Sequence, residues 1–174
     1  MSIPTDPKTQ AAPTEDARLE EFVDSVVIAR PRHELFLFWR DFGNLPKFME
    51  KVRKVTVVDS LSSIWTVAAS SGESTDWEFI VTDEEADRLI AWSASGNTPV
   101  KYSGRVEFND VSPTVTEVTA TLRYEPPSGI IDTLLAKVSG TPAADELAVQ
   151  KRSDLLRFKE VMEATAPAGV VGAL

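Results

Sequence analysis

The chain shows helical spacing of apolar residues near residue 35 and strand-like alternation along its middle. Residues 22–28 form a β-branched run that predicts a strand. Pro31 suits the first position of a following helix. The apolar face of this helix has the i, i+3, i+4, i+7 spacing and consists of Leu35, Phe38, Trp39 and Phe42. Gly43 is placed to end that helix, and Asn44 can cap a second short helix that contains Leu45, Pro46, Phe48 and Met49. A strand followed by two short helices is therefore expected.

The segment from residue 52 to residue 125 changes to short β-type runs separated by turn residues. The runs cover residues 52–58, 64–69, 77–82, 89–94, 102–108 and 115–124. Residues 83–87 are mostly acidic and predict a charged turn. Because six consecutive strands with short links favour antiparallel neighbours, this segment predicts an antiparallel meander.

Alternate positions on these strands divide into an apolar and a polar face. The apolar positions are Trp77, Phe79, Val81, Ile90, Trp92, Ala94, Tyr102, Gly104, Val106, Phe108, Val118, Ala120, Leu122 and Tyr124. The opposite positions carry polar residues, including the carboxylates of Asp76, Glu78, Glu107 and Glu117. A sheet with one apolar face must be covered, so we expect a helix to lie across that face.

The last third of the chain supplies helical segments for this cover. Ser128 can cap a first segment that contains Ile130, Ile131, Leu134, Leu135 and Val138. Thr141 and Pro142 provide a second helix start, and the apolar stripe that follows consists of Leu147, Leu155, Phe158 and Met162. Polar positions of that helix include Lys151, Arg152, Arg157 and Lys159. The expected fold class is α+β, with a curved antiparallel sheet of about seven strands wrapped around a long C-terminal helix and two short helices after the first strand.

Residues 38–49, with the sequence FWRDFGNLPKFM, resemble a signature of the SRPBCC (START-like, helix-grip) superfamily, specifically of its bacterial polyketide cyclase/dehydrase and coenzyme Q-binding-like group. Further matches follow in order at Trp77 and in residues 90–93, 104–108, 124–127 and 154–159. The resemblance covers about residues 22–163. It implies a helix-grip fold with a deep cavity between the sheet and the C-terminal helix. Members of the superfamily use this cavity for lipids, sterols, quinones, polyketides and other apolar molecules.

The resemblance implies no shared reaction. Some relatives catalyse aromatic cyclisation or dehydration, while many only carry or sense a ligand, and fold alone does not decide between these. Similar bacterial sequences often carry a histidine two residues after the Phe-Met pair, where this chain has Lys51. A proton-transfer role of that histidine therefore does not carry over to this chain.

Composition and charge narrow the classes of function. The 174 residues suit one domain over residues 21–164, between a disordered arm at residues 1–20 and a flexible tail at residues 165–174. The net charge of −9 opposes nucleic-acid binding, which needs clustered cations. The absence of cysteine excludes thiolate chemistry, and a single histidine, His33, expected on the surface, excludes sites that need two imidazoles. We expect no metal, no cofactor and no membrane-spanning segment, and a cytoplasmic location.

The four tryptophans are the most informative candidate site residues, with Trp39 on the first helix and Trp65, Trp77 and Trp92 on three successive strands. Such rings can bind an aromatic or polycyclic ligand by burial and offset stacking, while their indole N–H groups orient a carbonyl. The alternative is that they simply fill the core. Residues 44–49 and 134–138 would gate the predicted cavity, which is lined by Trp39, Phe42, Phe48, Trp65, Trp77, Phe79, Trp92, Tyr102, Phe108, Leu134 and Phe158.

The carboxylates alternate into solvent, so the sequence offers no convincing inward acid–base pair. Binding of a hydrophobic small molecule that is polyketide-, quinone- or lipid-like is therefore the leading hypothesis. A metal-free cyclase or dehydratase that uses the same cavity is the alternative, with Tyr102 and Tyr124 as candidate proton donors. An interaction module with a filled core is the third. Both monomer and homodimer remain open, as does a peripheral membrane contact through the basic cluster of Lys47, Lys51, Arg53 and Lys54.

Overall fold

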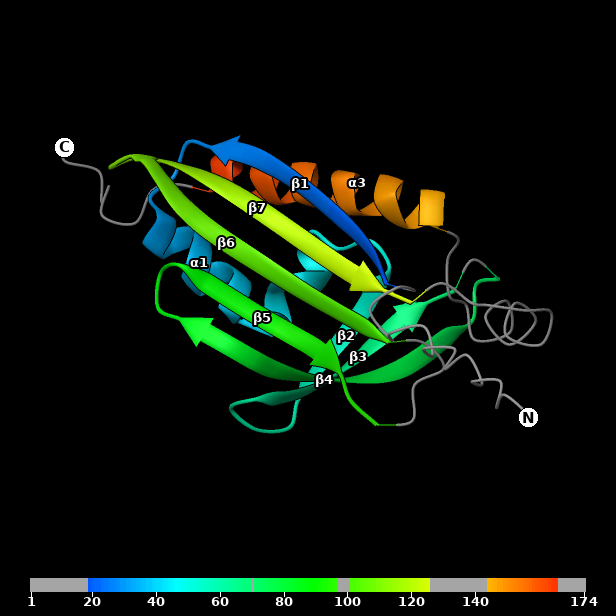
Figure 1. The fold of residues 1–174 in the computed structure, drawn as a ribbon. Helices are drawn as coiled ribbons and strands as arrows, with labels where there is room; N and C mark the ends of the chain where they lie inside the picture. Colours follow the sequence, from blue (N-terminus) through cyan, green and yellow to red (C-terminus); the bar gives the residue numbers. More distant parts are fainter. Residues whose placement is uncertain (1–18, 70, 97–100, 126–143, 166–174) are drawn as a thin grey trace, which may run out of the picture.

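Seven antiparallel strands form one sheet in the order β1-β7-β6-β5-β4-β3-β2. The computed structural model describes residues 19–69, 71–96, 101–125 and 144–165. Strands β2 to β6 each pair with the next strand in the sequence, and β7 also pairs with β1. The curved seven-strand antiparallel sheet expected from the alternation is confirmed (Figure 1). The strands are β1 (Glu20–Ile28), β2 (Val52–Val57), β3 (Ser62–Ala68), β4 (Ser74–Glu85), β5 (Leu89–Ala94), β6 (Tyr102–Ser112) and β7 (Val115–Tyr124).

The helices lie on one face of this sheet. The α-helix α1 (Arg32–Arg40) and the 3-10 helix η2 (Phe42–Lys47) connect β1 to β2, and the long helix α3 (Ala144–Ala164) follows β7 in the sequence. Figure 1 shows α1 and α3 on the same side of the strands, with α3 running along β1 and β7. The expected arrangement of two short helices after the first strand and a long C-terminal helix across the sheet is confirmed.

The boundary between the two short helices differs from the expected one. Helix α1 ends at Arg40, before Gly43, because the backbone of Asp41 leaves the helical conformation. The carboxylate of Asp41 then accepts the backbone N–H of Gly43 at 3.2 Å, so Asp41 and not Asn44 caps η2. The side-chain amide of Asn44 instead donates to the carbonyl of Phe38 at 3.1 Å and ties the two helices together.

Strand β4 extends beyond its apolar segment into the acidic residues that follow. Asp83, Glu84 and Glu85 pair with residues 89–91 of β5, after a register shift that follows Val81. The prediction of a turn over residues 83–87 is therefore wrong for its first three residues. Backbone pairing continues after the bulge although these side chains are exposed, and the chain reverses at Asp87, whose φ is 63°.

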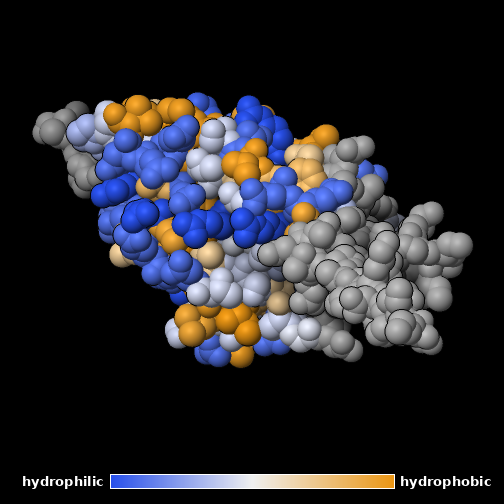
Figure 2. Space-filling view, viewed as in Figure 1, coloured by the Kyte–Doolittle hydropathy of each residue, from blue (hydrophilic) through white to orange (hydrophobic). Residues whose placement is uncertain are grey.

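The two faces of the sheet have the polarity that the alternation predicted. Figure 2 looks onto the outer face, which is largely hydrophilic. Asp76 and Glu78, which alternate with Trp77 and Phe79 on β4, are exposed. The inward stripe of α3 covers the other face with buried Leu147, Leu155, Phe158 and Met162. The segment expected at residues 128–138 lies outside the described residues, as does most of the expected N-terminal arm and C-terminal tail.

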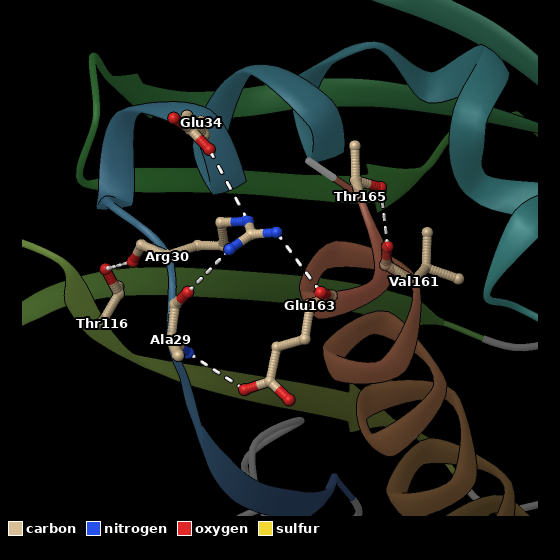
Figure 3. Close-up of polar contacts among 7 residues, drawn as sticks. All are labelled: Ala29, Arg30, Glu34, Thr116, Val161, Glu163 and Thr165. Atoms are coloured by element: carbon tan, nitrogen blue, oxygen red, sulfur yellow. Dashed lines mark hydrogen bonds and ion pairs between the residues drawn. The ribbon is translucent and has the colours of Figure 1, made fainter. Parts of the chain in front are cut away.

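The C-terminal end of α3 is fixed to the corner between β1 and α1 (Figure 3). Arg30 donates from Nη2 to the carbonyl of Glu163 at 3.3 Å, and the carbonyl of Arg30 accepts the hydroxyl of Thr116 at 2.7 Å. The backbone N–H of Ala29 donates to the Glu163 carboxylate at 3.0 Å. This hydrogen bond, helped by Lys159, holds the pKa of Glu163 below its ordinary value. Because the last carbonyls of a helix lack intrahelical donors, Arg30 stabilises the final turn of α3.

Candidate functional site

Aromatic side chains from α1, the sheet and α3 meet between the sheet and the helices. Trp39 of α1 contacts Phe48 and Phe158, with ring centroids 4.8 and 4.9 Å apart. Trp65 of β3 contacts Phe79 of β4 at 4.3 Å. Aromatic pairs attract at such separations, beyond the gain from burial alone. The rings therefore pack against one another and form an apolar interior.

The predicted lining residues differ in exposure along this interior. Trp77 and Tyr102 are half-buried, and their ring centroids lie 6.2 Å apart. Leu134 lies outside the described residues. The interior is thus closely packed around Phe158 and partly exposed around Trp77 and Tyr102. The remaining predicted residues are buried, with exposures of 6% or less, and are Trp39, Phe42, Phe48, Trp65, Phe79, Trp92, Phe108 and Phe158.

The indole N–H groups in the interior differ in their hydrogen bonding. Trp65 Nε1 donates to the hydroxyl of buried Ser63 at 2.8 Å. Trp39 Nε1 and Trp92 Nε1 are also buried, but neither has a hydrogen-bond partner within the part of the chain that the structure describes. The rings of Trp39 and Trp92 lie 6.4 Å apart. The two unpartnered donors therefore belong to neighbouring rings of an aromatic interior.

A glycine on the neighbouring strand determines the position of one of these donors. Trp92 on β5 lies directly opposite Gly104 on β6. The space that a side chain at Gly104 would occupy is filled by the Trp92 indole, including its Nε1 atom. A glycine in a strand interior often marks such a close approach.

A lysine interrupts the apolar stripe of α3. Lys151 lies four residues after Leu147 and four before Leu155, and its side chain is half-buried. Its Nζ is 5.9 Å from the ring centroid of Tyr102 and 3.8 Å from Asp154 Oδ2. Lys151 is expected from the sequence among the polar positions of this helix, but it lies on the inward stripe. Its spacing from both leucines is the sequence signal that identifies this position.

Asp154, on the same side of α3, is a buried carboxylate that the sequence did not single out. Its Oδ1 accepts the side-chain amide of Gln150 at 2.9 Å and the backbone N–H of Glu50 at 3.2 Å. Burial raises the pKa of Asp154 above its ordinary value, against the opposing effects of Lys151 and of these hydrogen bonds. Burial acts to lower the pKa of Lys151, but interactions with Tyr102 and Asp154 raise it overall. The Lys151 ammonium therefore stays charged at neutral pH.

The sequence profile of the family described as polyketide cyclase/dehydrase and lipid transport matches residues 28–148. The chain belongs to this family. The matched residues include Trp39, Trp92 and Tyr102, and they end before Lys151 and Asp154.

Solved structures agree with membership in the polyketide cyclase/dehydrase family. The protein DR_A0006 from Deinococcus radiodurans is 31% identical, with a TM-score of 0.63 over 83% of this chain and 98% of that chain. The Zhui aromatase/cyclase from Streptomyces sp. R1128 is 18% identical, with a TM-score of 0.70 over 89% and 99%. A START superfamily protein from Mycobacterium smegmatis is 12% identical, with a TM-score of 0.61 over 83% and 94%. The Zhui and Mycobacterium smegmatis structures share the START-like fold with this chain, and their low sequence identity supports no further similarity. No curated protein is significantly similar to the chain.

The two tyrosines predicted as proton donors lie in different surroundings in this polyketide cyclase/dehydrase family member. Tyr102 is half-buried beside the Lys151 ammonium. Tyr124 is 2% exposed and stacks on Phe22, with ring centroids 6.3 Å apart. Burial, together with the nearby Glu20 carboxylate, raises the pKa of Tyr124. Tyr102, with a cation at its side, is thus the better placed of the two for proton donation.

The single histidine lies on the surface, as expected. The His33 side chain is 63% exposed, and its Nδ1 lies 2.7 Å from Asp87 Oδ1. Within residues 19–69, 71–96, 101–125 and 144–165, no group of three or more histidine or carboxylate side chains is arranged to hold a metal ion. No helix in the same ranges is long and apolar enough to cross a membrane.

A surface pocket of about 200 Å³ lies between η2 and the β2–β3 hairpin. Arg40 donates to the carbonyl of Ser60 at 2.7 Å and to Glu84 at 2.6 Å. Asp59 accepts the backbone N–H groups of Leu61 and Ser62 at 2.8 Å. The Asp59 bonds stabilise the turn between β2 and β3, and Arg40 joins this turn to Glu84 of β4. The pocket is lined by Arg40, Asp41, Phe42, Val57, Asp59, Ser60, Leu61, Ser62 and Ser63.

Proposed function

We propose that this chain binds an apolar, ring-containing small molecule, polyketide-, quinone- or lipid-like, between its sheet and α3. The observation that carries the proposal is the pair of buried indole N–H groups of Trp39 and Trp92, which have no partner within the described residues. A buried donor left without an acceptor costs about 1–3 kcal/mol. An apolar ligand with an acceptor oxygen removes this cost when it enters the interior.

The surroundings of the two donors support an aromatic or polycyclic ligand. Trp39 and Trp92 are accompanied by the rings of Trp65, Phe79 and Trp77, which face the same interior. Ligand sites are commonly lined by apolar and aromatic side chains, with a few polar groups that fix orientation. Family membership adds support, because the family description includes polyketides and lipids.

The test has two parts that use the purified full chain. Organic extraction followed by mass spectrometry identifies a small molecule that co-purifies. Titration with 9-fluorenone, a three-ring ketone, is then followed through the four indole N–H resonances in 1H–15N NMR spectra. We expect the resonances of Trp39 and Trp92 to shift most, because a carbonyl accepts from them. The Trp65 resonance serves as the internal control, since its N–H already bonds to Ser63.

Replacement of Trp39 or Trp92 by phenylalanine assigns each resonance and removes one donor while keeping an aromatic ring. We expect each variant to bind 9-fluorenone about threefold to tenfold more weakly, because each lacks one hydrogen bond to the ligand carbonyl. The proposal is wrong if nothing co-purifies and none of the four indole resonances responds to 9-fluorenone.

The same interior supports cyclisation or dehydration as a second candidate function. The observation that favours it is the contact between Tyr102 and Lys151. If the Tyr102 hydroxyl gives its proton to a ligand carbonyl oxygen, the ammonium of Lys151 stabilises the phenolate that remains. Turnover of a linear poly-β-ketone thioester by the wild type, lost in Y102F while ligand binding is retained, would support this function. Equal turnover in Y102F would contradict it.

A further inference from the structure

Lys151 places a positive charge on the inward, otherwise apolar side of α3, at the partly exposed end of the interior. We propose that Lys151 and the Tyr102 hydroxyl bind an acidic oxygen of the ligand, so that the ligand is an apolar ring system with an anionic end. The acidic oxygen belongs to a carboxylate, a phenolate or an enolate. This inference rests on the proposed function, because the anion site is one end of the same interior.

The geometry leaves Lys151 with donors for such an oxygen. An ammonium has three N–H groups. The distance of 3.8 Å to Asp154 Oδ2 exceeds that of a hydrogen bond, and Asp154 Oδ1 already accepts from Gln150 and from the backbone of Glu50. Asp154 therefore accepts no hydrogen bond from Lys151, and the hydrogen bond between the Lys151 and Tyr102 side chains leaves further N–H groups for the ligand. The raised pKa of Lys151 agrees with this arrangement.

The wall on the sheet side of this charge is aromatic. The Tyr102 ring lies 6.2 Å from the ring of Trp77 and 5.9 Å from that of Phe79. Aromatic walls reduce the access of water to this half-buried charge, and a charge-assisted hydrogen bond there is stronger than at a fully exposed site. The site therefore discriminates between an ionised oxygen and a neutral one.

The anion site is chemically distinct from the indole donors. Tyr102 lies two residues from Gly104 on β6, and Gly104 lies opposite Trp92. Two residues along a strand span about 6.6 Å, which is roughly the length of two fused six-membered rings. The neutral indole N–H groups suit a carbonyl, whereas Lys151 suits an anion. A ligand that reaches both points carries two different oxygens.

Three probes with one ring skeleton separate these two points: fluorene, 9-fluorenone and fluorene-9-carboxylate, the last ionised at pH 7. Isothermal titration calorimetry of the full chain gives their affinities. We expect K151M to weaken fluorene-9-carboxylate binding by about tenfold or more and to change 9-fluorenone binding by less than about twofold. Y102F weakens carboxylate binding by about threefold, since one neutral donor is lost.

Two further variants separate recognition from structural damage and from general charge attraction. D154N removes a negative charge that opposes the ligand, so we expect it to raise the affinity for fluorene-9-carboxylate by about threefold. Loss of folding cannot produce such a gain. K54M changes an exposed lysine on β2 in the same way as K151M and is expected to leave both affinities unchanged.

The outcomes distinguish this inference from the proposed function. The anion site is wrong, although ligand binding is retained, if K151M loses equal affinity for the carboxylate and for 9-fluorenone. It is also wrong if K54M loses as much affinity for the carboxylate as K151M does. Unchanged carboxylate binding in K151M contradicts it as well. If the wild type binds none of the three probes, both the proposed function and the anion site are wrong.

Discussion

The indole of Trp92 on β5 occupies the space of a missing side chain at Gly104 on β6. A Cβ atom at Gly104 would lie 2.4 Å from Trp92 Cε2 and Cζ2 and 2.8 Å from Nε1. The two residues are direct cross-strand partners, so the sheet itself brings the ring to this position. Gly104 therefore fixes the location of one of the two unpartnered N–H donors on which the proposed ligand site depends.

Replacement of Gly104 by alanine is expected to displace the Trp92 ring. The contact distances are too short for a Cβ, so the ring must rotate or the strands must separate, and overpacking of this kind costs about 1–3 kcal/mol. Urea unfolding measures this loss, and the shift of the Trp92 indole resonance reports the displacement. S103A, on the neighbouring position of the same strand, is the control. A G104A protein as stable as S103A, with an unchanged indole resonance, would contradict the assignment.

The hydrogen bond between Trp65 and Ser63 is expected to increase the free energy of unfolding, whereas the indole N–H of Trp92 has no such bond within the described residues. Trp65 Nε1 donates to the Ser63 hydroxyl at 2.8 Å, and Ser63 is 2% exposed. S63A leaves the buried indole N–H without its partner, so we expect a loss of about 1–3 kcal/mol in the free energy of unfolding. A double-mutant cycle of S63A with W65F checks this result. The two losses should be clearly less than additive, and full additivity would show that the bond contributes nothing.

The strands that the sequence predicted best are those with alternation and turn residues at both ends. The bounds of β5 and β7 match the predicted runs at residues 89–94 and 115–124. Strand β4 was predicted too short, because charged side chains at residues 83–85 hide a pairing that backbone hydrogen bonds alone maintain. The cap of η2 was assigned to Asn44, and Asp41 competes successfully for it because its carboxylate reaches Gly43.

The apolar part of the candidate site could be predicted from alternation, whereas its charged part could not. Side chains such as Trp92 and Phe79 face inward because they share a strand face with other apolar residues. Lys151 and Asp154 are charged, and charged residues are almost never fully buried unless they are paired. Their contacts with Tyr102 and with the backbone of Glu50 join distant parts of the chain. The spacing of Lys151 from Leu147 and Leu155 indicates its inward position, but local spacing cannot reveal which distant residues it contacts.

Arg30 is expected to hold the C-terminal turn of α3 against the sheet. Its guanidinium donates to the carbonyls of Ala29 and Glu163, and its side chain is only 13% exposed. R30M keeps most of the aliphatic side chain but removes these bonds. We expect the free energy of unfolding to fall by about 1–3 kcal/mol and the amides of residues 161–165 to exchange faster with solvent. R53M, at an exposed arginine on β2, is the control, and equal exchange in both variants would refute the role of Arg30.

The Glu163 carboxylate is expected to make the stability of the chain depend on pH. Its bond from the backbone of Ala29 lowers the pKa of Glu163 in the folded state, so the ionised form stabilises the fold. This contribution is present above the ordinary pKa of a glutamate and is lost as the pH falls through the lowered folded-state value. We therefore expect E163Q to be less stable than the wild type at pH 7 and to approach it near pH 3. E160Q, at an exposed position on the same helix, is the control in urea unfolding across this range. A difference between E163Q and the wild type that stays constant with pH would show that Glu163 acts through packing and not through its charge.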